Sequence, residues 1–260
     1  MTDLRYFVVD AFTDRAFAGN PAAVYPLDAW LPDATLRAIA AEMALSETAF
    51  VARDGDDLRL RWFTPEVEVD LCGHATLATA HLLFTRFEPE AERLRFTTQS
   101  GWLEVSRDGD RLALDFQARP PLPCAVPESL AAALGTQPVE VLGARDYFVV
   151  LRSAEAVRAI KPDFARLATL DRAAVIVTAP GEDCDFVSRF FAPAMGIPED
   201  PVTGSAHCTL IPYWSRRLGK ISLLARQLSA RGGELFCEDR GERVAIAGHS
   251  VLYLEGIIYI

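Results

Sequence analysis

Two short segments combine glycine with polar residues where the hydrophobic pattern predicts that helices begin. Gly73-His74-Ala75-Thr76 leads into a predicted apolar helix ending near Phe84, and Gly204-Ser205-Ala206-His207 leads into another ending near Leu218. The first turn of a helix offers backbone N–H groups and a partial positive charge, which bind anions such as carboxylates. Glycine at the start lets a ligand approach the backbone. Two such starts facing each other across a cleft would hold a small carboxylate-bearing substrate.

Glu47 is the side chain best suited to move a proton. It lies in Leu45–Phe50, between a predicted helix end and a predicted strand at 48–52. Burial at the entry to that strand would raise the carboxyl pKa above its reference of ~4.3 and make it a better proton shuttle near neutral pH. An exposed surface carboxylate is the alternative that the sequence leaves open.

Four further side chains near the helix starts each allow a structural and a functional interpretation. His74 is either a packing residue or a substrate contact and second proton carrier. Cys72 is either a small buried hydrophobe or a reactive thiol at a helix start. Asp200 and Ser205 lie in a segment rich in helix-capping residues, so each is either a cap or a substrate-binding group.

The surroundings of the two helix starts indicate an internal duplication. Phe63-Thr64-Pro65 precedes Cys72 by the same spacing as Phe191-Ala192-Pro193 precedes Asp200. In both halves a predicted strand therefore leads through a short loop to a helix start. We expect two similar lobes, with Asp200 standing where Cys72 stands in the other half.

The remaining pattern predicts an α+β protein of two lobes. The stiff, proline-rich stretch 119–123 separates an N-terminal lobe, residues 1–118, from a C-terminal lobe, residues 119–260, whose last strand is able to pack back on the first lobe. The expected helices span 33–44, 73–84, 128–134, 154–160, 162–167 and 204–218, the last with a kink at Pro212. The expected strands span 6–12, 48–52, 58–63, 94–116 (two hairpins), 147–151, 174–178, 186–191, 243–246 and 251–260.

The composition and the absence of several motifs argue against some classes of partner and enzyme. The net charge of −10 and the absence of basic runs argue against nucleic-acid and anionic-membrane partners. Five cysteines without C-x-x-C spacing argue against disulfides and a zinc site, and the sequence shows neither a signal peptide nor a membrane span. A cytoplasmic globular protein is expected. Nucleotide, metalloprotease and serine-hydrolase motifs are absent, which favours proton transfer without a cofactor.

Taken together, the sequence resembles the PhzF-like, phenazine-biosynthesis isomerase family of the diaminopimelate-epimerase fold over essentially its full length. The resemblance implies two lobes, each a barrel-like, mostly antiparallel sheet around a central helix, with the active site in the cleft between them. It also implies a homodimer and a biosynthetic isomerase that needs no cofactor. The segments that carry it are Val9–Phe12, Gly19–Val24, Ser46–Phe50, Asp70–Thr76 and Glu199–His207.

The resemblance also implies roles for single residues. Glu47 matches the glutamate that shuttles a proton between carbons of trans-2,3-dihydro-3-hydroxyanthranilate. Asn20 and Cys72 are further candidates for the site. The residues expected to bind an anionic, carboxylate-bearing substrate are Gly73, His74, Asp200, Gly204 and Ser205.

The racemases and epimerases of this fold use two facing thiols, one in each half. Here Cys72 is present and Asp200 is expected in place of its partner. This favours a proton shift by the single base Glu47. A racemase or epimerase that uses Cys72 with a non-cysteine partner, and a non-catalytic small-molecule-binding or interaction protein, remain as alternatives.

Overall fold

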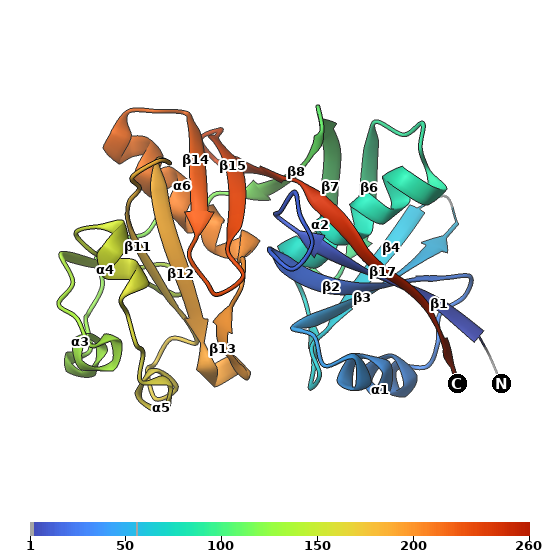
Figure 1. Ribbon diagram of the computed structural model, residues 1–260, viewed down its shortest axis with the longest axis horizontal. Helices are drawn as coiled ribbons and strands as arrows, with labels where there is room; N and C mark the ends of the chain where they lie inside the picture. Colours follow the sequence, from blue (N-terminus) through green and yellow to red (C-terminus); the bar gives the residue numbers. More distant parts are fainter. Residues whose placement is uncertain (1–2, 56) are drawn as a thin grey trace. The chain divides into compact units, whose positions relative to one another are not determined.

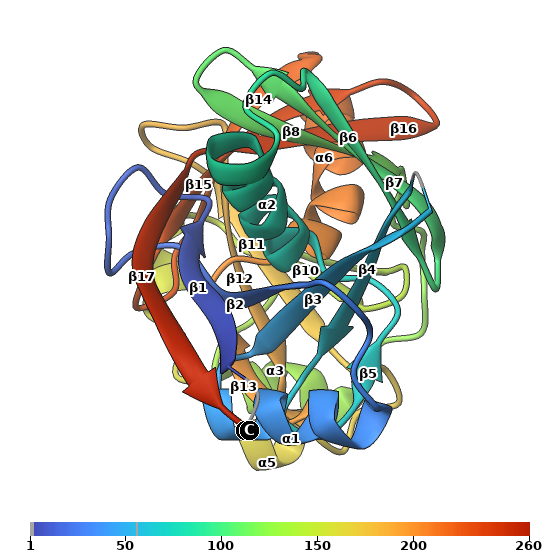
Figure 2. The same ribbon diagram turned by 90° about the vertical axis from the view of Figure 1, so that its right-hand side faces the viewer.

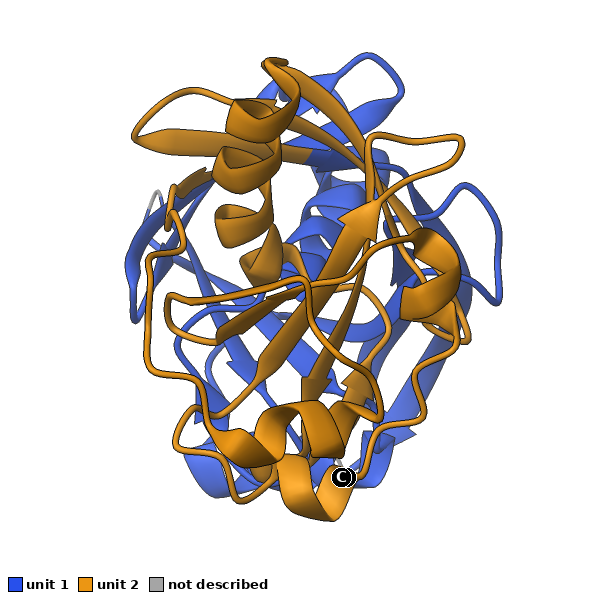
Figure 3. Ribbon diagram, turned by 90° about the vertical axis from the view of Figure 1, so that its left-hand side faces the viewer, with its two compact units in different colours: residues 1–115, 247–260 blue, residues 116–246 orange. Residues whose placement is uncertain are grey.

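The computed structural model describes residues 3–55 and 57–260. The chain divides into unit 1, which comprises the residues up to Asp115 together with Ala247–Ile260, and unit 2, Phe116–Ile246 (Figure 3). The division after Asp115 lies three residues before the sequence-based boundary between residues 118 and 119. The C-terminal strand belongs to unit 1, in line with the expectation that the last strand packs back on the first lobe. The reason is that β17 (Ser250–Tyr259) pairs antiparallel with β1 (Asp3–Ala11) along most of its length.

Unit 1 is a mostly antiparallel sheet around a central helix. Its other strands are β2 (Asn20–Leu27), β3 (Glu47–Asp54), β4 (Asp57–Phe63), β5 (Glu68–Val69), β6 (Arg93–Thr98), β7 (Gly101–Asp108) and β8 (Arg111–Gln117). They follow the order β17-β1-β2-β3-β4-β6-β7-β8, in which β2–β3 and β4–β6 are parallel and the other neighbours antiparallel. The sheet curves around helix α2 (Gly73–Leu82), which packs against β1, β2, β3 and β17 (Figure 2). Helix α1 (Asp33–Met43) packs against β3 and β4.

Unit 2 repeats this plan. Its strands are β9 (Glu140–Gly143), β10 (Tyr147–Val150), β11 (Val175–Pro180), β12 (Phe186–Ala192), β13 (Ile197–Asp200), β14 (Ser222–Gln227) and β15 (Gly233–Asp239), followed by β16 (Arg243–Gly248). Pairing along β9-β10-β11-β12-β14-β15 alternates between antiparallel and parallel in the same order as along β1-β2-β3-β4-β6-β7. The short β13 pairs with β12 as β5 pairs with β4. This shared pairing pattern supports the duplication expected from the sequence.

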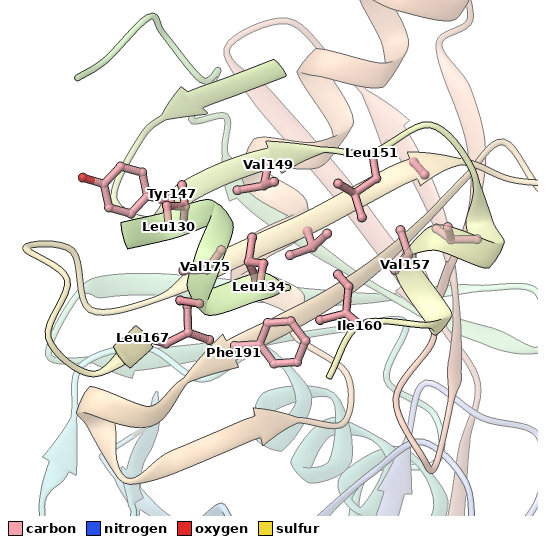
Figure 4. Packing of buried hydrophobic residues seen from close by; sticks show 14 of the residues in the cluster. Leu130, Leu134, Tyr147, Val149, Leu151, Val157, Ile160, Leu167, Val175 and Phe191 are labelled. Carbon is pink, nitrogen blue, oxygen red and sulfur yellow. The ribbon is translucent and has the colours of Figure 1, made fainter. Parts of the chain in front are cut away.

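The sheet of unit 2 carries helices on both faces. Helix α6 (Gly204–Leu218) packs against β14 and β15 (Figure 1), and Trp214 on it donates a hydrogen bond to Thr178 of β11 at 2.9 Å. Alternate residues of β11, Val175 and Val177, point the other way into an apolar core (Figure 4). Residues of α3 (Glu128–Leu134), α4 (Ala154–Arg158) and α5 (Phe164–Leu167) complete that core.

Most predicted elements occur within a few residues of their expected bounds, with two local differences. The helix expected over 73–84 ends at Leu82 and continues as a π-helical turn, Leu83–Phe87. The helix expected from Pro162 begins at Phe164, because the Asp163 side chain accepts a hydrogen bond from the backbone N–H of Arg166 and caps it. Helix α6 runs through Pro212 without a break. Across the described ranges, no helix is both long and apolar enough to span a membrane.

Candidate active site

Side chains alternate between the two faces of β2 and β3, and two polar side chains on these strands point toward helix α2. Tyr25 of β2 and Phe50 of β3 point into the core beneath α1. Side chains at odd offsets from these residues must point to the opposite face of the sheet, where α2 lies. Asn20, the first residue of β2, and Glu47, the first residue of β3, both belong to that alternate set. The strand register therefore brings both toward His74, the second residue of α2.

Asn20 follows a turn that requires glycine, and polar contacts at both ends of its amide fix its direction. Gly19 has a φ of +64°, and a Cβ atom there would lie 2.2 Å from the carbonyl oxygen of Ala11. A side chain at position 19 is therefore excluded, which explains the glycine. The Asn20 amide oxygen accepts a hydrogen bond from Ser46 Oγ at 3.3 Å, and its Nδ2 lies 3.2 Å from Nδ1 of His74. Asn20 is thus fully buried and oriented from both ends.

His74 is a buried, neutral imidazole. Burial lowers its pKa to about 3, because an imidazolium cation loses its hydration there. Since Nδ1 faces the amide N–H of Asn20, it acts as the acceptor and the ring proton is assigned to Nε2. Nε2 lies 3.4 Å from Oε2 of Glu47. The protonated ring nitrogen of His74 therefore lies next to the glutamate carboxyl.

Cys72 completes the cluster from the residue before α2. It is the N-cap residue of that helix, and its Sγ lies 3.5 Å from Nδ1 of His74. Cys72 is 5% exposed, whereas the Glu47 side chain retains 12% exposure. One ligand-type atom from each of Glu47, Cys72 and His74 lies within 4.8 Å of the others. A carboxylate, a thiol and an imidazole are therefore gathered at one point of unit 1.

The corresponding helix start in unit 2 corrects one sequence-based assignment. The N-cap residue of α6 is Thr203, and Asp200 ends β13 three residues earlier. Thr203, not Asp200, therefore occupies the position that Cys72 has before α2. The error arose because the spacing was counted from the strand ends, and the second loop is three residues longer. The residue equivalent to Cys72 in the second repeat therefore carries a hydroxyl rather than a thiol.

A buried hydrogen-bond network holds the start of α6. Gln227, the last residue of β14, accepts from the backbone N–H of Thr203 at 2.9 Å and donates to the carbonyl of Asp200 at 2.8 Å. The Thr203 hydroxyl donates to Oδ2 of Asp200. Asp200 is 7% exposed, while Ser205 is half-buried in the first turn of α6. The network fixes the carboxylate of Asp200 beside the N-terminus of the helix.

The structure gathers the predicted residues into two groups. Asn20, Glu47, Cys72, Gly73 and His74 form the cluster of unit 1, and Asp200, Gly204 and Ser205 surround the start of α6 in unit 2.

Three contributors escaped sequence reasoning: Ser46, Thr203 and Gln227. The shared pattern of a small residue, glycine and a polar residue in Cys72-Gly73-His74 and Thr203-Gly204-Ser205 would have identified Thr203. No sequence signal pointed to Gln227, which lies 24 residues from Thr203 along the chain.

Comparison with known proteins gives a consistent result. Residues 9–256 match the family model PhzC-PhzF, described as phenazine biosynthesis-like protein. An uncharacterized isomerase from Pseudomonas aeruginosa is 60% identical over 98% of both chains, and a phenazine biosynthesis-like domain-containing protein from mouse is 40% identical over 98% of this chain and 99% of the relative.

Solved structures agree with these sequence matches. A PhzF family protein from Enterococcus faecalis superposes with a TM-score of 0.97 at 49% identity, with both chains fully covered. A hydroxyproline epimerase from Agrobacterium vitis shares the fold, with a TM-score of 0.61 at 11% identity over 99% of this chain and 91% of that one.

Proposed function

Because the chain belongs to the PhzC-PhzF, phenazine biosynthesis-like family, several of whose members are named isomerases, we propose that it is an isomerase itself. In this proposal it moves a proton between carbon atoms of a small carboxylate-bearing molecule, and no cofactor takes part. Glu47 is the general acid and base. A substrate of the trans-2,3-dihydro-3-hydroxyanthranilate type fits this chemistry.

The observation that carries the proposal is the environment of Glu47. Its side chain is largely buried but retains 12% exposure, so it is held in place and still reachable. The imidazole beside it is neutral, and its Nε2 lies 3.4 Å from Oε2 of Glu47. General acid–base catalysis by a positioned carboxyl contributes about 10²–10⁴-fold to a rate. Glu47 can take a proton from one carbon and return it to another.

The helix N-caps support a one-base route. A two-thiol racemase removes a proton with one cysteine and returns one from the other side with the second. Thr203 supplies a hydroxyl where that second thiol would stand, and an alcohol is a far weaker acid than a thiol. We therefore propose that one group, Glu47, removes and returns the proton on the same face of the substrate.

The helix starts are proposed to bind the substrate. Backbone N–H groups in the first turns of α2 and α6, beginning at Gly73 and Gly204, suit a carboxylate. Asp200 and Ser205 are proposed to contact amino or hydroxyl groups of the substrate. We also propose that the chain forms a homodimer, which its mass in solution tests directly.

Deuterium exchange tests the role of Glu47. The protein is incubated in D₂O with trans-2,3-dihydro-3-hydroxyanthranilate and related unsaturated carboxylates, and deuterium in the carbon skeleton is followed by NMR. Glu47→Gln should lose about 10²–10⁴-fold in exchange rate. Glu42→Gln, on the exposed face of α1, should match the wild type. Equal incorporation by wild type and Glu47→Gln would remove Glu47 from the mechanism.

A further inference from the structure

The cluster of unit 1 contains the ligand types that a borderline-soft divalent cation prefers. Cys72 offers a sulfur, His74 a ring nitrogen and Glu47 a carboxylate oxygen, all within 4.8 Å of one another. Zinc in proteins is bound by this set of atoms, and thiolate ligands select it over magnesium and calcium. Spacing along the chain conceals the set, because Glu47 comes from β3 and the other two from the start of α2.

The distances suit tetrahedral coordination at one edge. With metal–sulfur and metal–nitrogen bonds of about 2.3 Å and 2.0–2.1 Å, sulfur and nitrogen ligands stand roughly 3.5 Å apart. Sγ of Cys72 and Nδ1 of His74 are separated by 3.5 Å. Glu47 now faces the other ring nitrogen, Nε2, at 3.4 Å. Its carboxylate must move toward the edge formed by sulfur and Nδ1 to become the third ligand.

Glu47 is the ligand best able to make that shift. It is the most exposed of the three side chains and begins its strand. His74 is fixed by helix α2 and by burial, and Asn20 gives up its contact with Nδ1 when a metal takes that position.

We propose that Cys72, His74 and Glu47 form an inhibitory Zn²⁺ site with three protein ligands and one open position. Binding would hold the Glu47 carboxylate on the metal and withdraw it from proton transfer. The claim that Zn²⁺ binds here is independent of the reaction. The claim that bound Zn²⁺ inhibits the enzyme rests on the proposed role of Glu47.

Proton balance makes the site dependent on pH. The Cys72 thiol must lose its proton to become the thiolate ligand, and that proton passes to the buffer. Affinity should therefore increase as the pH is raised.

Cobalt titration tests binding without any substrate. Co²⁺ replaces Zn²⁺ in such sites and gives a thiolate-to-cobalt charge-transfer band in the near ultraviolet. The reduced wild-type protein should show this band and lose it when Zn²⁺ is added, whereas Mg²⁺ should leave it unchanged. Cys72→Ser should abolish the band. Cys184→Ser removes a half-buried thiol in unit 2, and this variant should still show the band. A missing wild-type band, or a band that persists in Cys72→Ser, overturns the site.

Glu47→Gln provides a second test if Cys72→Ser does not fold. It replaces a partly exposed side chain with one of the same size and shape, so the variant should fold. Its Zn²⁺ affinity, measured by competition with a chromogenic chelator, should fall roughly tenfold or more; an unchanged affinity overturns the carboxylate ligand. Zn²⁺ should also suppress deuterium exchange by the wild type, with recovery on adding EDTA. Binding without suppression contradicts only the claim that bound Zn²⁺ inhibits the enzyme. Absence of exchange in metal-free wild type contradicts the proposed function and leaves the binding result intact.

Discussion

Nε2 of His74 lies 3.4 Å from Oε2 of Glu47, and the imidazole is neutral because it is buried. A neutral N–H donor can face the glutamate in both of its protonation states without adding a charge to the site. An imidazolium would instead form an ion pair with the carboxylate and oppose its protonation. The pairing therefore suits a group that must alternate between base and acid during one turnover.

His74 should be a supporting group rather than the proton carrier. His74→Gln keeps a polar side chain but displaces the donor that faces Glu47. We expect a smaller loss of deuterium exchange than the ~10²–10⁴-fold expected when Glu47 itself is replaced. His81→Gln, further along the same helix, should leave the exchange rate unchanged. If His74→Gln and Glu47→Gln lose equal activity, the imidazole is a proton carrier as well.

Stability should fall in mild acid because of two buried histidines. Burial lowers the pKa of His74 to about 3 and that of His207 to about 4, both below the usual histidine pKa of 6.5. Between these values the unfolded chain binds protons that the folded chain rejects. The stabilisation is therefore complete above about pH 6.5 and is lost as the pH falls toward 4, by up to about 1.4 kcal/mol per pH unit for each histidine.

Urea denaturation at several pH values measures this slope. The double variant His74→Gln, His207→Gln should show a shallower dependence of the free energy of unfolding on pH between about 4 and 6.5 than the wild type. Equal slopes would show that these imidazoles are not neutral in the folded protein.

Gln227 should matter for both stability and substrate binding. Gln227→Leu removes its hydrogen bonds to Thr203 and Asp200 and leaves buried backbone groups unsatisfied. Each such group costs about 1–3 kcal/mol. The melting temperature should fall, and KM should rise more than kcat falls, since the network positions Asp200 and does not transfer the proton. Gln117→Leu, at an exposed position, is the matched control, and a normal KM in a folded Gln227→Leu would contradict the positioning role.

Much of the fold was predictable because its local signals are strong. Alternating apolar strands around Asp54-Gly55, and the apolar periodicity after Asp33, identified β3, β4 and α1 near their observed bounds. The duplicated strand–loop–helix unit indicated two similar lobes. The path of the last strand was harder to predict, because its pairing with β1 depends on contacts between the two ends of the chain.

For the candidate site, the sequence predicted the types of residue better than it predicted which side chains contact each other. Glu47, His74 and Cys72 were identified, but their mutual contacts depend on the parallel register that places Glu47 opposite Ala22. The neutral state of His74 depends on burial, which follows from α2 lying inside the sheet. The roles of Gln227 and Ser46 depend on hydrogen bonds that only the folded chain defines.

Cys72→Ala separates the proposed isomerase from a thiol-dependent racemase. If Glu47 alone moves the proton, deletion of the thiol should leave deuterium exchange within about tenfold of the wild type, far above the level expected for Glu47→Gln. Iodoacetamide would be a weaker test, because a bulky adduct beside His74 would also block the substrate. Loss of exchange in a folded Cys72→Ala, with exchange retained in Glu47→Gln, would assign the base to sulfur. In that outcome the Thr203 hydroxyl could not serve as an equivalent partner, so water or another residue would have to return the proton.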